Sequence, residues 1–231
     1  MKQRKFELTS NELKLFALVV MTVDHIGALL PPHYRILRII GRLAYPIFAY
    51  MIAEGCTYTS NRPRYLLTIF CLGAAMQILF WFTRHSLYQH ILITFSMSIV
   101  LIYSLHLGVK RGGVWLFAAG LILALVAFIC LFLRRFLHRN SFAVDYGLCG
   151  VLLPVLIYAA QTRSQKLLAA AIGLIAVCLP MGGIQWYSLL ALPLLALYRG
   201  QRGTHRLKYL FYAYYPLHLV IIESIRLSVR R

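Results

Sequence analysis

The sequence predicts an all-α fold, a polytopic transmembrane helix bundle with about nine spans. Of its 231 residues, 61% are hydrophobic and only 13% are charged, which is far more apolar than a soluble domain of this size. Apolar runs long enough to cross a bilayer follow one another along the chain, with short loops between them. We therefore expect residues 1–231 to form a single integral membrane domain with roughly eight to ten spans.

The expected spans are apolar runs bounded by polar loops. They lie near residues 13–30, 36–55, 65–83, 91–108, 113–133, 144–160, 166–181, 184–198 and 207–226. The two runs after residue 166 are short, which is why the number of spans is approximate. Basic residues precede the first run, as in a signal peptide, but Asp24 and His25 interrupt it and many spans follow. We therefore take it as the first helix.

The basic residues predict contact with lipid and no nucleic-acid partner. The chain has 24 Lys and Arg against 6 acidic residues, a formal net charge of +18. Almost all of these cations fall in loops, where anionic headgroups attract them, and no basic soluble domain is left to bind DNA. Their distribution favours a cytoplasmic N-terminus in the inner (plasma) membrane. The 5 cysteines are scattered without ligand spacing, so we expect no metal site.

The first two spans contain charged residues, which are costly in a bilayer unless they are paired. Asp24 and His25 lie in the first span, and Arg38 and Arg42 lie in the second. At about 1.5 Å of rise per residue, Asp24, His25 and Arg42 are each about 9–10 Å from the turn between the spans. An unpaired charge at a helix centre costs roughly 2.5–3.5 kcal/mol. We therefore predict an ion pair between Asp24 and Arg42, with the imidazole of His25 beside it.

The polar residues of the other spans are expected to line a cavity in the bundle. These are Glu54 near the inner boundary, and Gln77, Asp145 and His218 in the outer half, with His218 following a proline kink on the last span. For Glu54 and Glu223 we favour a structural alternative, pairing with Arg62, Arg64 or Arg226 at the interface. For His25, which adjoins an aspartate and has a second histidine available, we favour a functional role.

Five blocks of sequence resemble the TraX family of membrane proteins. They are Leu13–Leu15 leading to Met21–Gly27, then Ile40–Phe48, Ala53–Gly55, Asp145–Gly147 and Tyr214–His218, and together they extend over nearly the whole chain. The resemblance implies an integral acetyltransferase, since founding members acetylate the amino terminus of conjugative pilin. The family is similar to acyltransferases of the acyltransferase-3 type, which carry an arginine and a histidine in the first helix with ten residues between them. Lys14 and His25 have this spacing, with lysine replacing arginine.

Acetyl transfer from acetyl-CoA to an amine or hydroxyl needs a base for the acceptor proton and donors for the developing oxyanion. The residues expected to be catalytic are His25, as the base, with Asp24 and Arg42. Those expected to bind substrate or cofactor are Lys14, Arg38, Tyr45, Glu54, Gln77, Asp145, Tyr215 and His218. The expected acceptor is a protein N-terminus of the pilin kind or a cell-envelope molecule, and acetyl-CoA is the only cofactor.

Two other functions fit the same residues. Buried His, Asp and Arg also form proton relays, so the chain is alternatively a transporter or a proton-coupled carrier. It is otherwise a scaffold of an envelope or conjugation assembly, in which the polar cluster only holds helices together. Transfer of labelled acetyl groups separates the enzyme from both.

Overall fold

The computed structural model describes residues 7–29, 34–137, 141–201, 203 and 208–229. This part of the chain is helical, with two isolated β-bridges and no strand. Contacts divide the chain into two compact units, residues 1–51 with 170–231, and residues 52–169. Each unit is described by itself.

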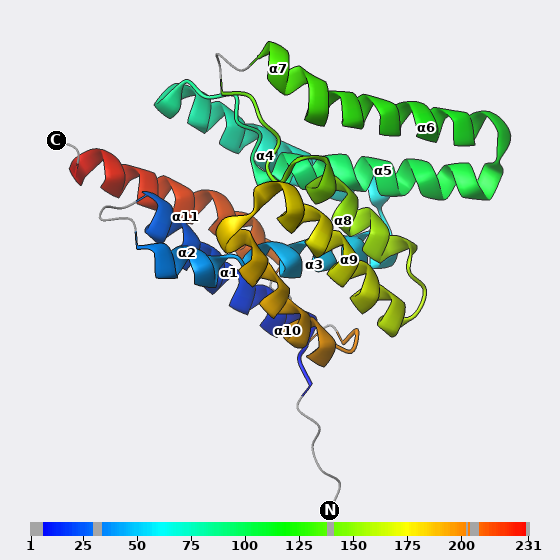
Figure 1. Cartoon of the computed structure of the whole chain (residues 1–231), viewed down its shortest axis with the longest axis horizontal. Coiled ribbons are helices and arrows are strands. Elements are labelled where there is room, and N and C mark those ends of the chain that lie inside the picture. Colours follow the sequence, from blue (N-terminus) through cyan, green and yellow to red (C-terminus); the bar gives the residue numbers. More distant parts are fainter. Residues whose placement is uncertain (1–6, 30–33, 138–140, 202, 204–207, 230–231) are drawn as a thin grey trace, which may run out of the picture. The chain divides into compact units, whose positions relative to one another are not determined.

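The first unit is organised around the N-terminal helix. Its elements are α1 (Ser10–Leu29), α2 (Arg35–Gly41), the start of α3 (Ala44–Tyr58), the end of α9 (Arg163–Met181), η3 (Gly183–Leu190), α10 (Ala191–Leu197) and α11 (Lys208–Val229). Helix α1 packs on both α2 and α11, and α2 also contacts η3 (Figure 1). The two ends of the chain therefore meet where α11 packs on α1, and η3 joins this group through α2.

The second unit is built on α5. Its elements are the end of α3, α4 (Arg62–Arg84), α5 (Ile91–Arg111), α6 (Gly113–Phe128), η1 (Ile129–Leu133), α7 (Arg134–Phe136), α8 (Gly147–Ala159) and the start of α9. Helix α5 contacts α4, α6 and α8, and Figure 1 shows α6 running beside it.

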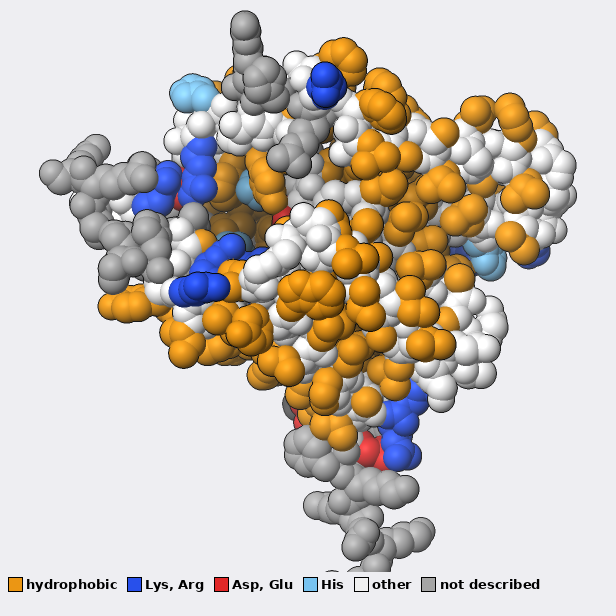
Figure 2. Space-filling view, in the orientation of Figure 1, with side chains coloured by type: hydrophobic (Ala, Val, Ile, Leu, Met, Phe, Trp, Pro, Cys, Tyr) orange, Lys and Arg blue, Asp and Glu red, His pale blue; other side chains and the backbone are white. Residues whose placement is uncertain are grey.

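Among the residues that the structure describes, five helical stretches are long and apolar enough to cross a membrane. They are residues 35–58 (α2 with α3), α4, α5, residues 113–133 (α6 with η1) and α9. Hydrophobic side chains cover much of the face in Figure 2, and the chain is a membrane protein. Residues 147–159 and 183–197 form shorter apolar helices, while α1 and α11 carry ionisable groups at several positions. The count of about nine spans therefore stays a prediction.

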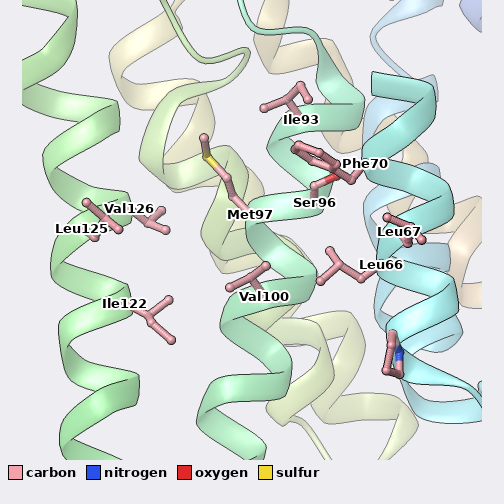
Figure 3. Close-up of a pocket in the computed structure, with 11 residues that line it drawn as sticks. Leu66, Leu67, Phe70, Ile93, Ser96, Met97, Val100, Ile122, Leu125 and Val126 are labelled. Atoms are coloured by element: carbon pink, nitrogen blue, oxygen red, sulfur yellow. The ribbon is translucent and has the colours of Figure 1, made fainter. Parts of the chain in front are cut away.

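An apolar groove of about 580 Å³ lies over α5, between α4 and α6 (Figure 3). It is lined by Pro63, Leu66, Leu67, Phe70, Ile93, Ser96, Met97, Val100, Ile122, Leu125 and Val126. The hydroxyl of Ser96 donates to the carbonyl oxygen of Leu92, within its own helix. The lining of this groove therefore contains no charged side chain, and the ionisable residues of interest lie outside it.

A capping box starts α1. The side-chain carboxylate of Glu12 accepts a hydrogen bond from the backbone N–H of Thr9 at 2.7 Å, and the hydroxyl of Thr9 accepts one from the N–H of Glu12 at 3.3 Å. This reciprocal pair satisfies donors that a helix N-terminus otherwise leaves open. The capping box fixes the residue at which α1 begins and therefore the position of Asp24 along the helix.

A break between α2 and α3 occurs at Arg42 and Leu43. Pro46 has no N–H to donate to the carbonyl of Arg42, and its ring crowds that carbonyl. The N–H groups of Arg42 and Leu43 donate instead three residues back, to Ile39 and Ile40, each at 3.2 Å. The proline thus interrupts the helix at the residue that carries the predicted ion pair.

Two glycines allow α1 and α2 to pack closely. A Cβ atom on Gly27 would lie 2.7 Å from the Cβ of Leu37, and one on Gly41 would collide with the side chain of Asp24. Small residues of this kind let membrane helices approach one another. The glycines beside Asp24 and Arg42 therefore bring these two charged residues within reach.

Replacing Gly41 with alanine should destabilise the first unit. The added methyl group would force Asp24 away from α2, and overpacking of this kind costs about 1–3 kcal/mol. Gly120→Ala in α6 is the matched control, because a Cβ atom there meets nothing within 4 Å, and it should stabilise the helix by at most about 1 kcal/mol. Unfolding in detergent micelles measures both, and equal effects of the two variants would contradict the packing argument.

Candidate functional site

Asp24 accepts bonds from two arginines in the first unit. One carboxylate oxygen, Oδ1, is 2.5 Å from Nη2 of Arg42, and the other, Oδ2, is bound by Nη1 of Arg38. The side chains of Asp24 and Arg42 are 13% and 9% exposed, and that of Arg38 is 30% exposed. The predicted pair of Asp24 and Arg42 is present, with Arg38 as a second partner. One carboxylate facing two guanidinium groups leaves the cluster with a net positive charge.

Arg42 links this cluster to the backbone of α2 and to η3. Its Nε donates to the carbonyl oxygen of Arg38 at 3.2 Å, and its Nη1 donates to Oε1 of Gln185 at 3.2 Å. Gln185 is buried in η3. Sequence reasoning missed this residue, although a single amide two residues after Gly183, in a largely apolar run, was a usable signal.

His25 faces the opposite neighbour, α11. Its Nδ1 lies 3.2 Å from Nε2 of His218, whose own Nδ1 lies 2.9 Å from the carbonyl oxygen of Tyr214. A carbonyl oxygen only accepts, so Nδ1 of His218 carries a proton. In neutral His218, Nε2 is then the acceptor, and Nδ1 of His25 must be the donor. These bonds leave the basic lone pair of His25 on Nε2.

Aromatic contacts hold the two histidines in place. The ring of Tyr214 stacks on His218 with centroids 5.2 Å apart and planes at 13°, and the ring of Tyr215 meets His218 edge-on at 5.6 Å. The hydroxyl of Thr22 donates to the carbonyl oxygen of Leu18 and lies 2.7 Å from the hydroxyl of Tyr214. The Thr22 oxygen therefore accepts from Tyr214, which ties α11 to α1 two residues before Asp24 and three before His25.

The side chains of the neighbouring residues Asp24 and His25 contact different helices. Consecutive side chains on a helix point about 100° apart, so the carboxylate reaches α2 while the imidazole reaches α11. The result is a polar network that runs from η3 through α2 and α1 to α11. It contains His25, Asp24, Arg42, Arg38 and His218, which are five of the residues that the sequence selected.

Three more predicted site residues, Lys14, Tyr45 and Tyr215, belong to the same unit, and Tyr215 contacts His218. The ammonium of Lys14 lies over the ring of Phe211, 5.8 Å from its centroid. Lys14 is about 16 Å from His25 along α1, given the rise of a helix. Tyr45 is buried near the start of α3.

The remaining predicted residues, Glu54, Gln77 and Asp145, belong to the second unit. Glu54 is buried and pairs with Lys166 at 2.5 Å, a partner that the sequence did not suggest. Nε2 of Gln77 donates to the carbonyl oxygen of Ser86 at 3.0 Å. Each of these contacts ties two segments of the unit together.

Asp145 holds the loop before α8 against the start of α5. Its Oδ1 accepts from the hydroxyl of Tyr88 at 2.6 Å, and its carbonyl oxygen accepts from the hydroxyl of Thr94 at 3.0 Å. Next to it, His90 caps α5 with its ring 4.1 Å from that of Phe80. Burial lowers the pKa of His90 to about 4, and the cation of Arg84 acts in the same direction.

The chain is similar in sequence to known proteins. A family model described as TraX protein matches residues 9–226. The chain belongs to the TraX family. An uncharacterized protein of Rickettsia prowazekii (strain Madrid E) is 35% identical to this TraX protein over 91 residues, which are 39% of the chain and 35% of that relative. A probable fimbrial assembly protein FimC, serogroup H1, of Dichelobacter nodosus is 28% identical over 78 residues, 32% of each chain.

This TraX protein therefore spans about a third of the length of these curated relatives. No solved structure matches it. Within the chain, two of the five TraX-like blocks meet at the Asp24 cluster, since Met21–Gly27 forms part of α1 and Ile40–Phe48 contains Arg42 and the break before α3. A third block, Tyr214–His218, supplies the contact to His25.

Removing the carboxylate of Asp24 should strongly destabilise the TraX fold. Asp24→Asn keeps the shape of the side chain but leaves two guanidinium groups without their counter-ion, and breaking a buried pair costs about 3–5 kcal/mol. Glu7→Gln is the matched control, because Glu7 forms an exposed pair with Arg199 at 3.0 Å and such pairs contribute at most about 1 kcal/mol. Unfolding in detergent compares the two, and similar losses would show that the Asp24 cluster is not a structural centre.

The stability of this TraX protein should fall as the pH drops from about 6.5 to about 4, through His90. The folded state keeps His90 neutral until about pH 4, whereas the unfolded chain binds a proton near pH 6.5. The unfolded state therefore binds more protons in this window, which removes on the order of 3 kcal/mol. The difference in unfolding free energy between the wild type and His90→Phe should change with pH there. A constant difference would contradict the burial of a neutral imidazole.

Proposed function

We propose that this TraX protein is an integral membrane acetyltransferase that moves an acetyl group from acetyl-CoA to an amine or a hydroxyl. The observation that supports this proposal most is the hydrogen-bonded series from the carbonyl of Tyr214 through His218 to His25. It directs a proton to Nδ1 of His25 and a lone pair to Nε2, which is the state that a general base needs. A residue that orients the base through its second nitrogen is a recurring feature of such sites.

The proposed reaction begins when Nε2 of His25 takes the proton of the acceptor amine or hydroxyl. The acceptor atom bonds to the thioester carbon, and the carbonyl electron pair moves to its oxygen. When this tetrahedral intermediate collapses, the carbonyl forms again and the carbon–sulfur bond breaks. The thiolate of CoA leaves with the proton from the His25 imidazolium. His218 stays hydrogen-bonded to Nδ1 throughout and stabilises the imidazolium without itself transferring a proton.

The Asp24 cluster supports this chemistry electrostatically. Its net positive charge favours the negative charge that develops on the carbonyl oxygen. Arg42 directs its N–H groups toward Asp24, Gln185 and the carbonyl of Arg38, so we assign it a positioning role. Lys14 and the basic loops would attract the phosphates of acetyl-CoA from the cytoplasmic side of the inner membrane.

The acceptor that we propose is the amino terminus of a fibre subunit of the pilin kind. The implied activity of the family supports this class, and one relative is described as a probable fimbrial assembly protein. A hydroxyl on a cell-envelope molecule is the alternative acceptor, since the same base removes either proton.

His25→Ala should lower acetyl transfer by about 10²–10⁴-fold, the usual contribution of a general base. The assay incubates isolated membranes with radiolabelled acetyl-CoA and separates labelled protein, glycan and small amines. His106→Ala is the matched control, because His106 lies on α5 and bonds to Tyr158 in the second unit. If the folded His25→Ala variant labels its acceptor at the wild-type rate, the assignment of the base is wrong.

A proton-coupled carrier is the second candidate, because two hydrogen-bonded histidines also conduct protons. Liposomes that contain the purified protein and a pH-sensitive dye separate the two functions. A carrier would move protons without acetyl-CoA, whereas the proposed enzyme would release CoA only when an acceptor is present.

A further inference from the structure

Gln185 is the most deeply buried polar side chain of the cluster, at 3% exposed. It lies in the first turn of η3, two residues after Gly183, and Gly182 and Gly183 have φ of +60° and +52°. Its backbone is anchored on both sides, since its N–H donates to the carbonyl of Gly182 at 3.1 Å and its carbonyl accepts from the thiol of Cys178 at 3.3 Å. The side chain therefore projects from a fixed turn.

The orientation of the Gln185 amide follows from its partner. Nη1 of Arg42 can only donate, so the atom that faces it at 3.2 Å must be the oxygen Oε1. Nε2 then carries two N–H groups that are buried and have no acceptor among the residues that the structure describes. Leaving a buried donor unsatisfied is costly and rare in native proteins, and a catalytic role, a bound water or an ion accounts for such a group.

The surrounding charge indicates which group would complete this donor. Asp24 carries one negative charge against the two positive charges of Arg38 and Arg42. This environment repels cations and favours an oxygen with negative or partly negative charge. A carbonyl oxygen that becomes an oxyanion fits both the free donors of Gln185 and the excess positive charge beside them.

We propose that Nε2 of Gln185 donates a hydrogen bond to the thioester carbonyl oxygen of the acyl donor. This inference rests on the acetyltransferase function proposed above. The bond strengthens as the carbonyl electron pair moves to the oxygen in the tetrahedral intermediate, and it weakens when the carbonyl forms again. Gln185 transfers no proton. Arg42 holds Oε1 and so aims the amide, which explains why its own N–H groups face protein oxygens.

The competing explanation is that Gln185 only supports Arg42, and Gln185→Glu separates the two. Glutamate has nearly the same shape and still accepts from Nη1 of Arg42, but it has no N–H to donate. A supporting role predicts little change in rate. The oxyanion role predicts a loss in kcat of about 10²–10³-fold, with a smaller change in KM for acetyl-CoA. Gln185→Met should lose a similar factor, and Ser188→Ala, buried in the same helix, should not.

A spectroscopic measurement detects the hydrogen bond without turnover. Acetyl-CoA labelled with carbon-13 at the carbonyl is bound to full-length His25→Ala protein in nanodiscs, and isotope-edited infrared spectra record its carbonyl stretch. The band should lie at lower frequency in His25→Ala than in the His25→Ala, Gln185→Glu double variant. Equal bands, together with wild-type kcat in folded Gln185→Glu, would overturn the role of Gln185 alone.

The proposed function fails in a different way. If the wild type neither binds acetyl-CoA nor transfers its acetyl group, the enzyme is wrong, and the role of Gln185 is overturned with it. If the wild type transfers acetyl groups and only the glutamine variants slow down with normal folding, both proposals are supported.

Discussion

A single carboxylate, that of Asp24, holds two guanidinium groups among apolar helices, and the first unit is arranged to make this possible. Gly27 and Gly41 let α1 and α2 approach, and Pro46 interrupts the helix where Arg42 lies. Without the carboxylate, α2 would bring two positive charges into a largely buried place. Packing and electrostatics are therefore coupled in this hairpin. The close packing of α1 on α2 brings the charged residues together, and their ion pairs in turn hold the two helices together.

The adjacency of Asp24 and His25 connects this structural centre to the proposed catalytic base. Because neighbouring side chains diverge on a helix, the carboxylate fixes α1 against α2 while the imidazole meets His218 on α11. The carbonyl of Tyr214 accepts from Nδ1 of His218 and so sets the proton position on both rings. These contacts orient one imidazole, and this orientation supports the proposed role of His25 in proton transfer.

The sequence predicted the parts of this site that follow from helix geometry. Asp24 and Arg42 lie at similar distances from one turn, which predicted their ion pair. His218 on the last span was noted only as a second histidine available to His25. The partners supplied by long-range packing were not predictable. Gln185 and the Lys166 partner of Glu54 are more than a hundred residues from the groups they bind, and no periodicity encodes such contacts. The count of about nine spans stays a prediction for two reasons. Residues 147–159 and 183–197 form short apolar helices, and α1 and α11 contain ionisable residues.

Nitrogen-15 spectra of histidine-labelled protein in nanodiscs test most directly that His25 is held as a base. At a pH where both rings are neutral, the account predicts a proton on Nδ1 and none on Nε2 for His25 and for His218. It also predicts that the Nδ1 proton of His25 is shared in a hydrogen bond with Nε2 of His218. A His25 ring that carries its proton on Nε2, or that exchanges between both tautomers as a free imidazole does, would contradict it.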